Sequence, residues 1–134
     1  MMNELFSLTG KTAIVTGALG LLGKQHCIAL SEAGANVIVA DIHTEKSKEF
    51  ADTLPQHSIG LSLDVTLEES VKTVRDIVLE SFGQIDILIN NAGISMRALF
   101  KDVEIDVIKK VMDINFFGTI YCTKMALQSV MERK

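Results

Sequence analysis

The sequence of 134 residues lacks the features that define several classes of protein. It has no uninterrupted apolar run of bilayer-spanning length, and its first residues lack the basic region and apolar stretch of a secretory signal. Its net charge is −4 and its longest basic cluster is the pair Lys109-Lys110, so it has no nucleic-acid footprint. We therefore expect a cytoplasmic protein that binds small molecules or protein, with no nucleic-acid partner and no membrane partner.

Cysteine and proline are also scarce. The two cysteines, Cys27 and Cys122, lie in apolar helical patterns and have no metal-ligand spacing to each other or to the three histidines. We expect two buried free thiols in a reducing compartment, and no metal site. Pro55 is the single proline. No internal repeat or linker interrupts the chain, and its 48% hydrophobic residues suffice for the core of one domain spanning residues 1–134.

Short β-rich runs alternate with helical patterns along the chain. Strands are predicted at residues 12–16, 36–40, 58–63 and 85–90. Helices are predicted at 21–33, at 45–53, at 66–82 with Thr66 and Glu69 forming a capping box, and at 104–134 with a bend at Gly118. Because the strands are nearly continuous apolar runs, the sheet should be parallel and covered on both faces. Right-handed crossovers then favour the strand order 3-2-1-4 of a doubly wound α/β fold.

Residues 12–23 carry the most informative motif, an apolar strand that runs into three glycines at the start of a helix. Gly17 permits a tight turn, Gly20 lets the backbone approach a pyrophosphate, and Gly23 lets the helix pack closely on the strand. Asp41 ends the next apolar run, which completes the layout of a dinucleotide-binding Rossmann-like unit. A phosphate-binding loop of the NTPase type does not fit, because five residues separate Gly17 from Gly23 and Gln25 follows Lys24.

Four motifs in this order make the chain resemble the short-chain dehydrogenase/reductase family over essentially its whole length. They are the loop Thr16 to Gly23, the pair Asp64-Val65, the run Asn90-Asn91-Ala92-Gly93 and the helix residue Asn115. They are similar, in that order, to the family's coenzyme loop, its adenine-contacting Asp-Val pair, its Asn-Asn-Ala-Gly signature and the asparagine of its catalytic tetrad. The resemblance implies hydride transfer between a nicotinamide cofactor and a small alcohol or ketone.

The resemblance also implies a set of site residues. Asn115 is the one catalytic candidate. The cofactor-binding candidates are Thr16, Gly17, Leu19, Gly20, Leu21, Leu22, Gly23, Asp41, Ile42, Asp64, Val65, Asn91, Ala92 and Gly93. A carboxylate at Asp41 would bind ribose hydroxyls and repel a 2′-phosphate, and neither Leu19 nor Ile42 is basic, so we expect NAD in preference to NADP. Lys46 is interpreted as a solvated residue of a helix's first turn.

Some of these residues also have simpler structural explanations. Asp41 could merely begin a turn, Asp64 could only start the loop before Thr66, and Asn115 could satisfy its amide by a local backbone bond. One of the two asparagines Asn90 and Asn91 should tie the fourth strand to neighbouring backbone. His26 and Cys27 are interpreted as helix-packing residues, because neither has a paired base or ligand at useful spacing.

Two features depart from the family pattern. Gly20 stands one place earlier than the middle glycine of the single-domain branch, and Leu21 occupies that position. The family's catalytic Ser and Tyr-x-x-x-Lys follow the long helix and have no counterpart in these 134 residues, since Tyr121 is followed at the fourth place by Met125. In the resembling enzymes that tyrosine is the general acid/base and the serine orients the carbonyl. The fold is therefore expected to be incomplete relative to the full family fold.

We interpret the chain as the coenzyme-binding part of an NAD-dependent short-chain dehydrogenase/reductase. The alternative is a non-catalytic NAD-binding or protein-interaction module, which would share every residue present. The run 85–90 has the composition of a central strand but no strand follows it, and the long helix spreads apolar residues over more than one face. We therefore expect self-association into a homo-oligomer.

Overall fold

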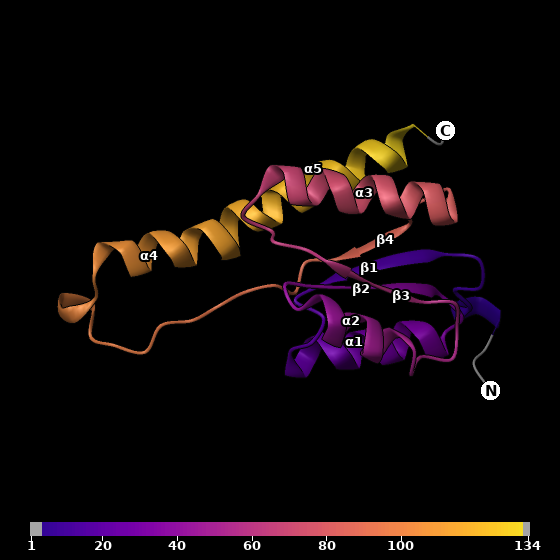
Figure 1. Ribbon diagram of the computed structural model, residues 1–134, viewed down its shortest axis with the longest axis horizontal. Helices are drawn as coiled ribbons and strands as arrows, with labels where there is room; N and C mark the ends of the chain where they lie inside the picture. Colours follow the sequence, from indigo (N-terminus) through magenta and orange to yellow (C-terminus); the bar gives the residue numbers. More distant parts are fainter. Residues whose placement is uncertain (1–3, 133–134) are drawn as a thin grey trace.

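The computed structural model describes residues 4–132, and it places a parallel sheet between two layers of helices (Figure 1). The strands are β1 (Thr12–Thr16), β2 (Asn36–Asp41), β3 (Ile59–Ser62) and β4 (Ile87–Ile89). The helices are α1 (Leu21–Glu32), α2 (Thr44–Ala51), α3 (Glu68–Phe82), α4 (Ile105–Met112) and α5 (Gly118–Met131). Single 3-10 turns lie at Glu4–Phe6 and Phe100–Asp102, and a π-helical turn at Asp113–Phe117 joins α4 to α5.

The four strands are hydrogen-bonded in the order β3-β2-β1-β4, and every pairing is parallel, as predicted. In the register, Ile14 lies between Ile38 of β2 and Leu88 of β4. All five residues of β1 are buried, because helices cover both of its faces. Since parallel strands share one direction, the segments that follow β1, β2, β3 and β4 all emerge at the same edge of the sheet.

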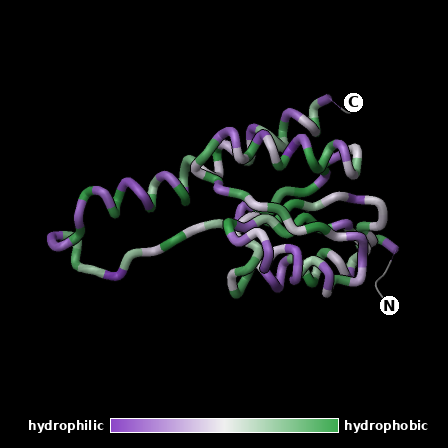
Figure 2. The backbone as a smooth tube through the Cα atoms, viewed as in Figure 1, coloured by the Kyte–Doolittle hydropathy of each residue, from purple (hydrophilic) through white to green (hydrophobic). Residues whose placement is uncertain are grey.

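The core is divided by the sheet into two apolar clusters, one on each face. Ile14 and Ile38 point toward α3 and α5, whereas Val15 and Val39 point toward α1 and α2. This alternation follows from the two-residue period of a β-strand. Figure 2 shows the strands largely in the hydrophobic colours, between helices along which hydrophilic and hydrophobic colours alternate.

Each face of the sheet buries one cysteine. Cys27 of α1 and Cys122 of α5 are fully buried and form no disulfide. Burial raises the pKa of the Cys27 thiol to about 12 and that of Cys122 to about 11, because an apolar surrounding disfavours the thiolate. Both residues are therefore protonated packing groups, which confirms the prediction of buried free thiols.

The start of α3 differs from the sequence prediction. The helix begins at Glu68, and Leu67 occupies the N-cap position without a side-chain bond to the helix. The hydroxyl of Thr66 donates instead to Oδ1 of Asp64 at 2.6 Å, and the same oxygen accepts the Thr66 N–H at 2.9 Å. The predicted capping box of Thr66 and Glu69 is thus wrong, because a tight Asp turn uses the hydroxyl that would have capped the helix.

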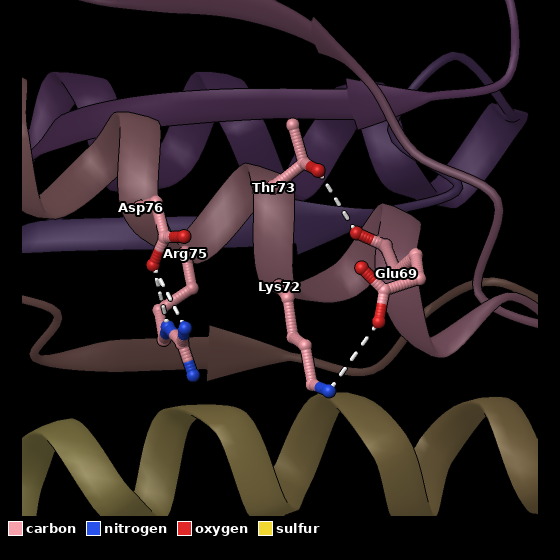
Figure 3. Close-up of polar contacts among 5 residues, drawn as sticks. All are labelled: Glu69, Lys72, Thr73, Arg75 and Asp76. Atoms are coloured by element: carbon pink, nitrogen blue, oxygen red, sulfur yellow. Dashed lines mark hydrogen bonds and ion pairs between the residues drawn. The ribbon is translucent and has the colours of Figure 1, made fainter.

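Glu69 takes part in local contacts on the solvent-facing side of α3. Its carboxylate pairs with Lys72 at 3.4 Å, and Asp76 pairs with Arg75 at 2.8 Å (Figure 3). The hydroxyl of Thr73 donates to the Glu69 carbonyl at 2.9 Å. An exposed i,i+3 pair such as Glu69–Lys72 contributes a few tenths of a kcal/mol, so it supports a solvated helix face and does not decide the fold.

The predicted helix at 104–134 is two α-helices joined by the π-helical turn. Gly118 is not a bend, because its φ of −59° and ψ of −42° are helical. It is a packing position, since a Cβ there would lie 2.6 Å from Cγ2 of Val65. Helix α4 extends away from the sheet beyond the edge at which the strands end (Figure 1). Within residues 4–132, no helix is long and apolar enough to cross a membrane.

Strand β4 is shorter than predicted, three residues in place of the run 85–90, and all three are half-buried. In the described part of the chain it pairs with β1 alone. A groove of about 250 Å³ runs between its outer side and α5. The apolar lining of this groove includes Ile87, Leu127 and Val130, so the sheet edge and the neighbouring helix face form one apolar surface.

Candidate functional site

A cavity of about 340 Å³ opens at the edge of the sheet where the strands end. In doubly wound folds ligands bind at this edge, where neighbouring crossovers leave toward opposite faces. The lining residues are Gly17, Leu19, Gly20, Asp41, Ile42, His43, Leu63, Asp64, Val65, Ala92, Gly93, Ile94 and Ile114.

The glycine turn after β1 forms one wall of this cavity. Gly17 has a φ of +59°, and a Cβ there would lie 2.7 Å from Cα of Ala92. A Cβ on Gly23 would collide with the carbonyl oxygen of Gly17. At Gly20 the nearest atom is that same oxygen at 3.4 Å, so the space beside this glycine is open. The first and third glycines are thus required by the fold, whereas the second leaves room for a ligand.

The N-terminus of α1 follows this turn and lacks a side-chain cap. Its N-cap residue is Gly20, which has no side chain to bond the N–H groups of the first helical turn. Those groups have no acceptor within an α-helix, and the helix dipole makes their surroundings favourable for an anion. The side chains of Leu21 and Leu22 are exposed beside this end.

Asp41 lies at the carboxyl end of β2 and lines the cavity beside the glycine turn. Its Oδ2 accepts the backbone N–H of Leu19 at 3.2 Å, and its Oδ1 accepts that of His43 at 3.3 Å. The carboxylate is therefore held in place from the glycine turn and from the loop before α2. An ionised carboxylate has about four lone-pair positions, so each oxygen can accept a further hydrogen bond from a ligand hydroxyl.

Asp64 lines the cavity as well, but its side chain is engaged locally. Its Oδ1 accepts both hydrogen bonds from Thr66 described above, and its backbone N–H donates to the Ser70 hydroxyl at 3.0 Å. Val65 is buried beside it and Ile42 is exposed across the cavity. Ile42 and Val65 thus give the lining of the cavity an apolar part beside Asp64.

Thr16 and Asn91 lie behind the wall and hold two turns together. The Thr16 hydroxyl accepts the N–H groups of Asn91 and Ala92, each at 3.0 Å. Nδ2 of Asn91 donates to the Gly17 carbonyl at 3.0 Å, so this asparagine ties the segment after β4 to neighbouring backbone. Asn90 donates instead to the hydroxyl of Thr123 on α5 at 3.0 Å.

Asn115 lies on the π-helical turn and contacts the segment after β4. Its Oδ1 accepts the N–H of Ile94 at 2.9 Å, and its Nδ2 donates to the Ile94 carbonyl at 2.8 Å. The prediction that Asn115 could bond to local backbone is wrong, because its partner lies far away in the sequence. A Cβ on Gly93 would lie 3.3 Å from Oδ1 of Asn115, so the contact also requires a small residue there. In this structure Asn115 is a positioning residue.

The predicted site residues fall into two groups. Most line the cavity, whereas a second group lies outside the lining: Thr16, Leu21, Leu22, Gly23, Asn91 and Asn115. The sequence analysis missed four lining residues, His43, Leu63, Ile94 and Ile114. All four directly neighbour a predicted residue in the sequence, so extending each motif by its flanking residues would have found them. Within residues 4–132, no cluster of His, Cys, Asp or Glu could hold a metal ion.

Comparison with known families now decides the assignment. The family model described as short chain dehydrogenase matches residues 11–134. The chain belongs to the short-chain dehydrogenase family. This membership confirms the resemblance carried by the glycine turn, the Asn-Asn-Ala-Gly run and Asn115.

Curated relatives support the assignment. The chain is 35% identical to dehydrogenase/reductase SDR family member 7B of Rattus norvegicus, over 95% of this chain and 42% of the relative. It is 36% identical to the short chain dehydrogenase/reductase astE of Aspergillus oryzae, over 97% and 52%. It is 35% identical to an uncharacterized oxidoreductase of Staphylococcus aureus strain USA300, over 94% and 55%. The chain thus spans about half the length of these short-chain dehydrogenase relatives.

The glycine turn yields a prediction about folding. Gly17→Ala and Gly23→Ala should each lower the free energy of unfolding by about 3 kcal/mol, because each added methyl group meets backbone and Gly17 also has positive φ. Gly20→Ala should lower it by less than about 1 kcal/mol, because the space beside it is open. Urea denaturation of the three variants measures the difference. Equal destabilisation by all three would mean that Gly20 also serves the fold.

Proposed function

We propose that this chain binds NAD in the cavity at the carboxyl edge of the sheet, as the coenzyme-binding part of an NAD-dependent oxidoreductase that acts on an alcohol/ketone pair. The observation that carries the proposal is the Asp41 carboxylate, fixed by two backbone N–H groups and facing the same cavity as the uncapped N-terminus of α1. A site for ribose hydroxyls and a site for a pyrophosphate thus share one cavity.

The chain offers a separate group for each part of the cofactor. The pyrophosphate would lie in the open space beside Gly20, where the N–H groups that follow Gly20 would bind it. Asp41 would bind the hydroxyls of the adenosine ribose. Ile42 and Val65 would contact the adenine, with Asp64 at its rim. The small residues Ala92 and Gly93 leave room for the second ribose. When bound, NAD supplies the hydride acceptor or donor, and these residues orient it.

Selectivity for NAD is the first testable consequence. The 134-residue chain should bind NAD more tightly than NADP, because Asp41 accepts hydrogen bonds from ribose hydroxyls and repels a 2′-phosphate. Asp41→Ala should narrow this preference and weaken NAD binding by roughly 1.5 to 3 kcal/mol, the range for charge-assisted hydrogen bonds. Titration calorimetry with both cofactors measures it. Equal affinity for the two cofactors in the native chain would show that Asp41 does not discriminate between a ribose 2′-hydroxyl and a 2′-phosphate.

Catalysis by these 134 residues alone is not expected. The family's Tyr-x-x-x-Lys pair has no counterpart among them, and Tyr121 is a half-buried residue of α5. Without a proton-transferring tyrosine, the chain should bind NAD but reduce none of it with a panel of secondary alcohols, as followed by NADH absorbance. Turnover that disappears in Asn115→Ala would contradict this. Binding without turnover is also what the alternative function requires, a non-catalytic NAD-binding module.

We further propose that the chain self-associates. Strand β4 pairs with β1 alone in the described residues, and the groove beside it is lined by apolar side chains. Further apolar residues are exposed along α4, the π-helical turn and α5: Ile105, Val107, Met112, Phe116, Phe117, Ile120, Leu127, Val130 and Met131. A free strand edge and an apolar surface of this extent both favour association with another copy.

The prediction for assembly is a concentration-dependent oligomer at micromolar concentration, measured by light scattering. Hydrogen exchange then distinguishes the two modes, because pairing through β4 would protect those amides of Ile87, Leu88 and Ile89 that do not already bond to β1, while packing through α4 and α5 would not. A stable monomer over the whole concentration range would rule out self-association.

A further inference from the structure

A groove of about 370 Å³ runs between α3 and α5. The two helices lie side by side over one face of the sheet (Figure 1). The groove shares no lining residue with the cavity beside Asp41. Its volume falls in the range of roughly 300 to 1,000 Å³ that is usual for small-molecule sites. We call it the α3/α5 groove, and the proposed NAD site gives it no role.

The apolar lining of the α3/α5 groove is covered by the core only in part. Val71 of α3 and Met125 of α5 are buried, whereas Leu127 and Met131 of α5 line the same groove and are more than half exposed. Single exposed apolar side chains are ordinary on a protein surface, but here they border one hollow together with buried ones. An alkyl chain lying in the groove would remove Leu127 and Met131 from water, and flexible methionine side chains adapt to such a chain.

Basic side chains border the same groove, on a chain whose net charge is −4. Lys72 and Arg75 line it from α3 and Lys124 lines it from α5, against one acidic lining residue, Glu68. Figure 3 shows the side chains of Lys72 and Arg75 extending from α3 toward the neighbouring helix. The lining therefore combines an excess of positive charge with an apolar surface.

These cations retain donors for a ligand. Lys124 takes part in none of the ion pairs of residues 4–132. Arg75 directs Nε and one terminal nitrogen at a single oxygen of Asp76, and a guanidinium has further N–H donors beyond these. Lys72 pairs with Glu69 at 3.4 Å, but both side chains are largely exposed, so this pair is weak and can exchange for another anion.

We propose that the α3/α5 groove binds the anion of an aliphatic carboxylic acid, a fatty carboxylate. The alkyl chain would cover the apolar lining that includes Leu127 and Met131, and the basic residues of the lining would bind the carboxylate. Charge-assisted hydrogen bonds to lysine and arginine fix the headgroup, and burial of the chain supplies the remaining affinity. The proposal is independent of the proposed NAD site, because the two sites have no lining residue in common.

The composition of the lining argues against other classes of ligand. A neutral amphiphile would leave Lys72, Arg75 and Lys124 without a counter-charge. A polyanion such as a nucleic acid needs an extended basic surface, which a chain of net charge −4 with a single such groove does not offer. An aromatic ligand would find one ring in the lining, that of Tyr121. A fatty carboxylate uses both the charge and the aliphatic surface.

The test is a calorimetric titration of the 134-residue chain with dodecanoate below its micelle concentration. Dodecanoate should bind about tenfold more tightly than octanoate, because its longer chain buries more apolar surface. It should also bind about tenfold more tightly than dodecyltrimethylammonium, which has the same alkyl chain and the opposite charge. Circular dichroism of each complex establishes that the chain stays folded.

Variants of the basic residues locate the site. Lys72→Gln combined with Lys124→Gln should weaken dodecanoate binding by about fivefold to tenfold, the range for two charge pairs close to solvent. Glu68→Gln should strengthen it, because the substitution removes the carboxylate of the lining. Lys48→Gln removes the same charge from α2, outside the groove, and should leave it unchanged. All these variants keep Leu127 and Met131, so they do not alter the apolar surface proposed for self-association.

Each contrary outcome has a definite meaning. Equal binding of dodecanoate and dodecyltrimethylammonium would overturn the proposal, because the groove would then select only for an alkyl chain. Equal binding of dodecanoate and octanoate would overturn it too, since the site would then recognise an anion alone. Full dodecanoate affinity in Lys72→Gln combined with Lys124→Gln would place the ligand elsewhere. NAD binding should be the same in these variants as in the native chain, so a chain that binds dodecanoate as expected and no NAD contradicts only the proposed NAD site.

Discussion

The contact between Gly17 and Ala92 is the constraint on which the rest of the site depends. Any side chain at Gly17 would meet the backbone that follows β4, so the turn after β1 and the segment after β4 have one way to fit together. Thr16 and Asn91 fasten that fit with three hydrogen bonds between the two segments. Because the turn is fixed, α1 begins at a defined place, and its N-cap residue Gly20 lines the cavity.

The same constraint explains why so many signature residues do not touch the cavity. Thr16, Gly23 and Asn91 act one layer behind it, where they hold backbone in place. Asn115 acts in a similar way from the π-helical turn, since both of its amide atoms bind Ile94. A family motif in the sequence therefore includes two kinds of residue, those that line the cavity and those that hold the lining residues in position. The two kinds are distinguished only by the three-dimensional structure.

Much of this architecture could be predicted from the sequence, because the strong signals are local and periodic. The strand order, the start of α1 and the buried cysteines follow from apolar runs, glycines and helix period. The failures have a common cause in long-range or competing contacts. Thr66 bonds to Asp64 rather than capping α3, Gly118 makes room for Val65, and the helix interruption falls on the π-helical turn. Likewise the cavity beside Asp41 is lined from the segments at the carboxyl ends of all four strands, which no local pattern brings together.

Asp41 has a structural role and, in the proposed function, a recognition role. Both roles use the lone pairs of the same two carboxylate oxygens. As a structural group its carboxylate accepts the N–H groups of Leu19 and His43, and in the proposed function it must also keep lone pairs for a ligand. Both roles are compatible because each backbone N–H group uses one lone-pair position on one carboxylate oxygen, which leaves another position on that oxygen. In the proposed function, ligand selectivity is therefore linked to how the loops around β2 are anchored, because the same carboxylate serves both.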